Sequence, residues 1–266
     1  VTVADKTAPD ITCPANIVAE CTSRDGEAVS YNAPTHSGNE CNGDATLSYS
    51  QVSGSTFPIG VTTVVCVATD PAGNKSTCSF TVTVQDTAAP SITCAAAPAS
   101  VEATSASGAV VTWTTAPSVT AIVQATATDV CDDNVAITYS PASGSTFVIG
   151  DTVVTATATD DYGNTSTCPF TVTVVDTTVP TISCASAPAS VEATSSAGAV
   201  VSWDSSQTTA ADVADSSVDV TYSPASGSTF AIGDTTVTAT ATDDASKTAT
   251  CSFTVTVTDN TDPTIT

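Results

Sequence analysis

One stretch of sequence, SGSTFVIGDTVVTATATDDYGNTSTCPFTVTVVD at residues 143–176, has close copies at residues 53–86 and 226–259. A shared glycine sets the spacing of the copies, which is 90 and then 83 residues. It falls at Gly60, Gly150 and Gly233. A period of this length is too long for one turn of a solenoid and fits one small domain per repeat. The chain is therefore expected to form three similar domains in tandem.

Each copy has the pattern of a β-hairpin. Runs such as TVVTATATD and FTVTV place a small or apolar residue at every second position, which is typical of a half-buried strand. The turn between the two runs reads DPAGN at 70–74, DDYGN at 160–164 and DDASK at 243–247. Further short β-branched runs bring each repeat to about seven strands. We therefore expect an all-β fold of three tandem immunoglobulin-like β-sandwich domains.

The repeats set the expected domain boundaries. Residues 1–5 match the end of a preceding repeat, the three repeats occupy 6–86, 87–176 and 177–259, and residues 260–266 match the start of a following repeat or an exchanged strand. We expect either a window from a longer array or terminal strands that complete a neighbouring subunit. The linkers are short and contain proline, so they predict an extended, semi-rigid rod.

Composition limits the partners of the chain. It carries 27 acidic and 4 basic side chains, with a formal net charge of −23, which disfavours nucleic acid and anionic membranes and favours cations. No apolar run is long enough for a membrane span. Ten cysteines in small β domains predict disulfides and an extracellular compartment. A single histidine, His36, has no counterpart in the other repeats and supports neither a zinc site nor a catalytic triad.

Four segments of the first repeat resemble the HYR (hyalin repeat) domain: ITCPANI at 11–17, SGSTFPIG at 53–60, ATDPAGN at 68–74 and CSFTVTV at 78–84. The resemblance covers nearly the whole chain, three times over. It implies an immunoglobulin-like extracellular module of matrix, adhesion and surface proteins, without catalysis. The third repeat departs from the pattern at 245–247, where Gly-Asn is missing, so the geometry of that turn is open.

Six cysteines recur in pairs, one near the first strand and one near the last strand of each repeat. The expected bridges are Cys13–Cys78, Cys94–Cys168 and Cys184–Cys251. The first repeat has two more cysteines, Cys21 and Cys66, and both of their positions become alanine together in the other repeats. This paired loss predicts a second bridge, Cys21–Cys66.

Cys41 and Cys131 occupy the same loop in the first and second repeats. In an extended chain these loops are separated by a domain length, which is beyond the reach of a disulfide. Two alternatives stay open: an intermolecular bridge from Cys41 of one chain to Cys131 of a neighbour, or two thiols that are free or separately capped.

Acidic residues are expected to gather where each linker enters the next domain, because the loop after the tryptophan and the last hairpin turn lie at that pole. Clustered carboxylates repel one another unless a cation joins them, and oxygen ligands alone favour Ca²⁺. The candidate ligands are Asp86, Asp129, Asp132, Asp133, Asp160 and Asp161, with Asp5 and Asp70 in the first repeat, Asp176, Asp243 and Asp244 in the third, and the recurring Glu102. The alternative is that these residues cap turns.

These features predict a non-enzymatic structural protein. We expect a subunit of an extracellular fibre or surface layer, which polymerises with copies of itself and is stiffened by disulfides and Ca²⁺. The alternative is an adhesive or ligand-binding stalk of a larger secreted or surface protein with an extracellular partner, and a third reading is a spacer attached to an extracellular hydrolase.

Overall fold

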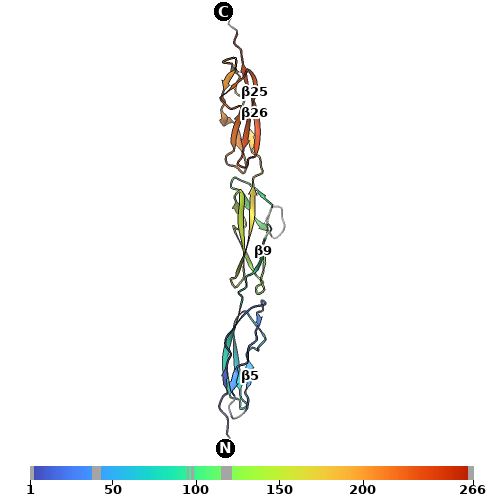
Figure 1. Ribbon diagram of the computed structural model, residues 1–266, viewed down its shortest axis with the longest axis vertical. Helices are drawn as coiled ribbons and strands as arrows, with labels where there is room; N and C mark the ends of the chain where they lie inside the picture. Colours follow the sequence, from blue (N-terminus) through green and yellow to red (C-terminus); the bar gives the residue numbers. More distant parts are fainter. Residues whose placement is uncertain (1–2, 38–42, 95, 97–98, 115–121, 263–266) are drawn as a thin grey trace. The chain divides into compact units, whose positions relative to one another are not determined.

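The structure is a computed structural model that describes residues 3–37, 43–94, 96, 99–114 and 122–262 (Figure 1). Its contacts divide the chain into two units, and each is described by itself. The first unit comprises Val1–Ala95, Ala125–Ser140 and Thr155–Pro169, and the second comprises Ala96–Gln124, Pro141–Val154 and Phe170–Thr266. Within the described residues, no helix has the length and apolar character needed to cross a membrane.

The first repeat is built on a four-stranded sheet in the order β2-β8-β7-β5. Its strands are β2 (Ile17–Glu20), β8 (Lys75–Gln85), β7 (Gly60–Thr69) and β5 (Thr46–Tyr49). β2 runs parallel to β8, whereas the other neighbours are antiparallel. Two small ladders complete the repeat: β1 (Asp10–Thr12) with β4 (Thr35–Ser37), and β3 (Glu27–Ala28) with β6 (Thr56–Phe57).

The same four-stranded order recurs twice. It is formed by β10 (Val101–Glu102), β18 (Thr165–Val175), β17 (Gly150–Thr159) and β15 (Ala136–Ser140), and by β20 (Val191–Glu192), β26 (Thr248–Thr258), β25 (Gly233–Thr242) and β23 (Asp219–Ser223). The small ladders are β9 (Ser91–Thr93) with β14 (Thr126–Thr128), β11 (Ala109–Val111) with β16 (Ser145–Phe147), β12 (Trp113–Thr114) with β13 (Ile122–Val123), β19 (Thr181–Ser183) with β22 (Thr209–Ala211), and β21 (Ala199–Val201) with β24 (Ser228–Phe230). The predicted all-β class with three tandem repeats is confirmed.

The predicted hairpin is the longest element of each repeat. In the third repeat β25 and β26, the orange-red strands in Figure 1, pair antiparallel from Gly233–Val257 to Thr242–Thr248. From Val237 onward every second side chain of β25 is fully buried, and these are Val237, Ala239 and Ala241. The threonines between them, Thr238 and Thr240, are half-buried on the other face of the sheet, where β-branched side chains suit a strand.

A recurring glycine brings two backbones into contact next to the core phenylalanine. Gly198 has φ of +107°, and a Cβ built on it would lie 1.8 Å from the carbonyl oxygen of Phe230. Phe230 itself is only 2% exposed. Gly26 and Gly108 make the same approach to Phe57 and Phe147. Glycine is required here twice over, by the positive φ and by the lack of space for a side chain.

The turn that departs from the pattern in the third repeat closes in the same way as the others. Ser246 adopts φ of +63° where the other turns have Gly73 and Gly163. The amide of Asp243 donates to the carbonyl of Lys247 at 3.1 Å, as Asp70 does to Asn74. The different sequence of this turn alters its side-chain contacts. Lys247 replaces the asparagine of the other turns, and Oδ2 of the buried Asp243 has no hydrogen-bond partner.

Candidate cation site at the first joint

Two joints between repeats have the same components. The first joint consists of the linker 86–90, the loop 129–134 and the hairpin turn 160–164. The second joint consists of the linker 176–180, the loop 212–217 and the turn 243–247. Each joint lies wholly within one of the two units.

A glutamate at the end of a short strand holds each linker. The amide of Thr87 donates to Glu20 at 2.6 Å and its hydroxyl donates to the other carboxylate oxygen at 3.0 Å. Glu102 accepts the same pair from Thr177, both at 2.7 Å. The parallel pairing of β10 with β18 places Glu102 beside the start of the linker. The structure therefore places Glu102, one of the expected metal ligands, on the linker backbone.

The hydrogen bonds from Thr177, first from its amide and then from its hydroxyl, lower the pKa of Glu102. A carboxyl group with a lowered pKa stabilises the folded state above its ordinary pKa of about 4.3, and this contribution is lost as the pH falls through the lowered value. We expect Glu102→Gln to lower the melting temperature of the second unit near neutral pH, and the difference from wild type to vanish in acid. Calorimetric melts across pH test this. A difference between the two proteins that stays the same from neutral pH to acid would contradict this role of the Glu102 charge.

The hairpin turn of the second repeat is clamped to the linker by Asn164. Its side-chain amide donates to Oδ2 of Asp160 at 2.9 Å and to the backbone carbonyl of Asp86 at 3.2 Å. Burial opposes ionisation of Asp160, but the hydrogen bonds from Asn164 and from the amides of Tyr162 and Gly163 together outweigh it and lower the pKa of Asp160. This carboxylate is therefore held charged beside the linker.

Three carboxylates converge at the first joint. Oxygens of Asp86, Asp129 and Asp160 all lie within 4.8 Å of one another. Asp86 is 7% exposed and Asp160 is 5% exposed. Oδ1 of Asp86 accepts from the amide of Ala88 at 3.1 Å, but its buried Oδ2 has no hydrogen-bond partner. Burial raises the pKa of Asp86, and the charges of Asp129 and Asp160 raise it further. This site has a buried anionic oxygen with no counterpart, which is what a hard cation would satisfy.

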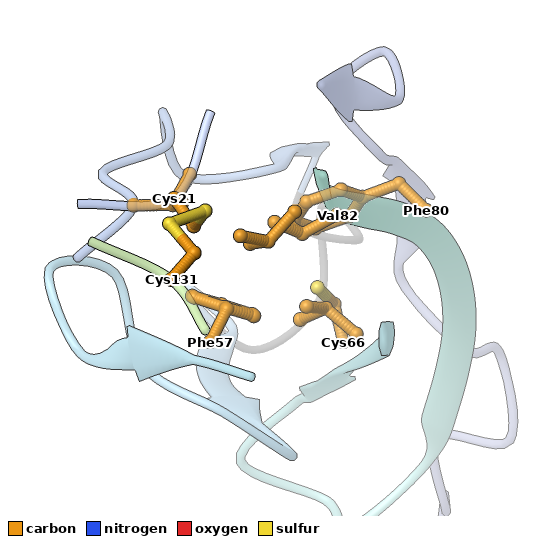
Figure 2. Close-up of a cluster of buried hydrophobic side chains, with 9 residues drawn as sticks. Cys21, Phe57, Cys66, Phe80, Val82 and Cys131 are labelled. Carbon is orange, nitrogen blue, oxygen red and sulfur yellow. A yellow bond between two sulfur atoms is a disulfide. The ribbon is translucent and has the colours of Figure 1, made fainter. Parts of the chain in front are cut away.

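A disulfide between Cys21 and Cys131 closes the same joint. Figure 2 shows this bond beside Phe57, with the sulfur of Cys66 separate from it. The expected Cys21–Cys66 bridge is wrong. Glu20 pairs with Gln85 at one end of β8, whereas Cys66 pairs with Cys78 nearer the other end. Six residue steps along β7, from Gly60 beside Val84 to Cys66 beside Cys78, separate these levels by roughly 20 Å, far beyond disulfide reach.

The expected intermolecular role of Cys131 is also replaced by this bridge, and Cys41 lies outside the described residues. The three recurring bridges are present as Cys13–Cys78, Cys94–Cys168 and Cys184–Cys251. Among the described cysteines Cys66 alone is free, and burial raises the pKa of its thiol.

Cys131 belongs to the second repeat, yet it is 5% exposed and packs in the core cluster of the first repeat with Cys21 and Phe57. Arg24 forms an ion pair with Asp133 at the rim of the joint.

The comparison with known proteins follows the repeats. The model of the HYR domain matches residues 4–84, 85–174 and 175–257. The chain belongs to the HYR domain family. Hyalin from Strongylocentrotus purpuratus is 32% identical over 262 residues, which cover 95% of this chain and 21% of that protein. Hyalin from Lytechinus variegatus is 32% identical over 272 residues, covering 98% of this chain and 49% of that protein. The chain thus spans about half the length of these relatives, or less.

Among solved structures, mouse cadherin-23 EC22-24 is 14% identical with a TM-score of 0.38, covering 95% of this chain and 99% of that chain. The HYR repeats, the hyalin relatives and the disulfides together indicate an extracellular or surface repeat protein.

The second joint between HYR repeats does not have the residues that form the disulfide and the ion pair of the first joint. Ala103 and Ala214 stand at the positions of Cys21 and Cys131, and Ala106 and Ser216 stand at those of Arg24 and Asp133. A pocket of about 190 Å³ lies here, lined by Ala106, Ala214 and Ser216 among others. These paired replacements across the joint were the sequence signal for the Cys21–Cys131 bridge.

The carboxylates of the second joint have a donor that the first joint lacks. The hydroxyl of Thr178 lies 2.7 Å from Oδ1 of Asp176 and 3.3 Å from Oδ2 of Asp212. The corresponding residue of the first joint is Ala88. Among the described residues, Asp176, Asp212 and Asp243 do not form a three-carboxylate group. The hydroxyl of Thr178 is therefore one difference in how the two joints satisfy the linker aspartate and the loop aspartate.

The other expected ligands lie around the joints rather than in the three-carboxylate group. Asp132 accepts from the amides of Asn134 and Asp161, both at 2.8 Å, and so ties the loop to the turn. Asp161 and Asp244 are exposed on their turns. In the first repeat Asp70 accepts from the amide and side chain of Asn74, which also reaches the carbonyl of Asp5.

Proposed function

We propose that the chain is a structural part of an extracellular fibre or surface layer, and that Ca²⁺ bound by Asp86, Asp129 and Asp160 stiffens its first joint. The observation that carries the Ca²⁺ site is the buried carboxylate of Asp86, whose Oδ2 has no hydrogen-bond partner. An oxygen of this carboxylate lies within 4.8 Å of oxygens of Asp129 and Asp160. The site offers only hard oxygen ligands, which Ca²⁺ prefers, and waters complete its shell of six to eight.

The cation would supply the positive charge that the three-carboxylate group lacks. Three carboxylates in one buried place repel one another, and this repulsion opposes the approach of the linker to the loop and the turn. A bound Ca²⁺ converts the repulsion into attraction and fixes three segments of chain around one point. Together with the Cys21–Cys131 bridge, this would restrict movement between the first two repeats. A restricted joint suits a fibre or layer subunit better than a flexible tether.

Calorimetric titration of the oxidised full chain with Ca²⁺ tests the site. We expect one Ca²⁺ per chain and a higher melting temperature in Ca²⁺ than in chelator. Asp86→Asn should abolish both effects, because it retains the shape and the Ala88 contact but removes the charge. Asp176→Asn, the matched change at the second joint, should preserve both. The site proposal fails if wild type binds no Ca²⁺ or if Asp86→Asn binds as well as wild type.

Electron microscopy of the native, unreduced protein in Ca²⁺ tests the assembly. Filaments or sheets formed by the protein alone support the fibre or layer role. Monomers at all concentrations would contradict it and favour the alternative, a stalk that carries a separate binding domain.

A further inference from the structure

We infer that the Cys21–Cys131 disulfide and the cation at the first joint are linked: breaking this one bond weakens cation binding, and bound cation protects the bond. The inference rests on the proposed Ca²⁺ site. It assigns the bridge a role in controlling that site, in addition to joining two repeats.

The disulfide and the site are in direct proximity. The two sulfur atoms and a carboxylate oxygen of Asp86 lie within 4.8 Å of one another. Cys21 is 6% exposed, Cys131 is 5% exposed and Asp86 is 7% exposed. A reductant therefore cannot reach the sulfurs unless the joint opens, and opening the joint also moves Asp86 away from Asp129 and Asp160.

Both ends of the bridge are tied to ligands through the backbone. The amide of Cys21 donates to the carbonyl of Gln85 at 2.9 Å, immediately before Asp86. The amide of Cys131 donates to Oδ1 of Asp129 at 2.7 Å. The disulfide thus closes a ring that runs from Asp86 through Cys21 and Cys131 to Asp129. Within this ring the position of one ligand fixes that of the other.

The remaining ligand does not depend on the bridge. Asp132 ties the loop to the turn through the amide of Asp161, and Asn164 holds Asp160 in that turn. Asp129 and Asp160 therefore stay together when the disulfide is broken. Asn164 also still holds the backbone carbonyl of Asp86, and the bridge adds a second constraint on the position of Asp86. We expect breakage to weaken Ca²⁺ binding rather than abolish it.

The second joint supports the association of the two features. Where the bridge is replaced by Ala103 and Ala214, the corresponding described acids do not form a three-carboxylate group. The bridge and the site are present together in one joint and are missing together in the other. The alanine pair also shows that this chain tolerates the substitution at a joint.

Linkage is reciprocal, so two measurements report the same coupling. The first compares Ca²⁺ affinity, by calorimetric titration, of the oxidised full chain and of the double variant Cys21→Ala with Cys131→Ala. We expect the variant to bind about tenfold more weakly, which is within the usual range of coupling between sites. Equal affinity in the two proteins would overturn the linkage and leave the Ca²⁺ site standing.

The second measurement follows reduction of the wild-type bond by dithiothreitol, a dithiol. The dithiol gives two electrons and two protons, the Cys21–Cys131 bond becomes two thiols, and the reagent closes into a cyclic disulfide. Alkylation of the released thiols and mass spectrometry after cleavage at aspartate identify each bond. We expect millimolar Ca²⁺ to slow this reduction about tenfold relative to chelator, and to leave the rate at Cys184–Cys251 unchanged.

The variant Asp86→Asn distinguishes a failure of the linkage from a failure of the proposed Ca²⁺ site. In this variant Ca²⁺ should no longer protect the Cys21–Cys131 bond. If Ca²⁺ protects the bond equally in wild type and in Asp86→Asn, the protection does not come from this site and the linkage is wrong. If wild type binds no Ca²⁺, the proposed site and the linkage fall together.

Discussion

Replacing Gly198 with alanine should cost the third repeat about 4 kcal/mol or more, which is in the range of exceptional single substitutions. The added Cβ would lie 1.8 Å from the carbonyl oxygen of Phe230 and 2.8 Å from its carbonyl carbon. Both atoms belong to the backbone, so no rotamer change relieves the clash. The strand β24 would have to move away from β21, and Phe230 would leave the core.

Gly233 provides the matched control because it has nearly the same positive φ without the contact. Its φ is +111°, against +107° for Gly198, and a Cβ there meets nothing within 4 Å. Gly233→Ala should therefore cost only the conformational term, about 1–2 kcal/mol. Calorimetric unfolding of the full chain measures both. Equal losses of stability in the two variants would show that the close approach to Phe230 is not what requires glycine.

The hairpins could be predicted because their signal is local. The alternation of Val, Thr and Ala in β25 fixes which side chains are buried, and the neighbouring turn residues fix where the strand ends. The turn at 243–247 was in doubt because glycine is missing there. Ser246 adopts a positive φ, and the backbone hydrogen bonds of the turn are preserved. Backbone conformation was thus less sensitive to this change than the side-chain contacts were.

The Cys21–Cys131 disulfide could not be predicted from the repeat pattern, because the pattern does not show which segments of neighbouring repeats meet. Because Cys21 and Cys66 are both replaced by alanine in the other repeats, the sequence predicted a bridge between them within the first repeat. The relevant pair of losses is Ala103 with Ala214, which lie in different repeats. It can be recognised only if the end of β2 and the loop 129–134 are known to meet at one joint. The parallel pairing of β2 with β8 determines this, and no local pattern in the sequence predicts it.

The acidic residues were predicted to gather at the joints by residue type, which could not distinguish their individual roles. Glu102 binds the linker backbone, Asp132 ties loop to turn, and Asp86 is left with an unpartnered oxygen. One of the residues that differ between the joints is next to these acids and is not itself acidic. The second position after the linker aspartate is threonine at Thr7, Thr178 and Thr261, and alanine at Ala88.

Exchanging these residues should exchange the Ca²⁺ response of the joints. Ala88→Thr would place a hydroxyl between Asp86 and Asp129, as Thr178 lies between Asp176 and Asp212. A hydrogen bond to a charged group contributes about 1.5–3 kcal/mol, which is similar to the stabilisation of about 2.7 kcal/mol expected from Ca²⁺ at a hundred times its dissociation constant. The variant should therefore be more stable than wild type in chelator and gain little from Ca²⁺.

Thr178→Ala should have the opposite effect at the second joint. Without the hydroxyl, Asp176 and Asp212 repel each other, so the melting temperature in chelator should fall and Ca²⁺ should restore part of it. Calorimetric melts of both variants in chelator and in Ca²⁺ give the comparison. Ala88→Val and Thr178→Val are the controls, because valine keeps the shape of threonine and lacks its hydroxyl. If Ala88→Val suppresses the Ca²⁺ response as strongly as Ala88→Thr, the effect is steric and the hydroxyl does not replace the cation. If only the threonine variant does so, one hydroxyl determines which joint of this HYR chain requires a metal ion.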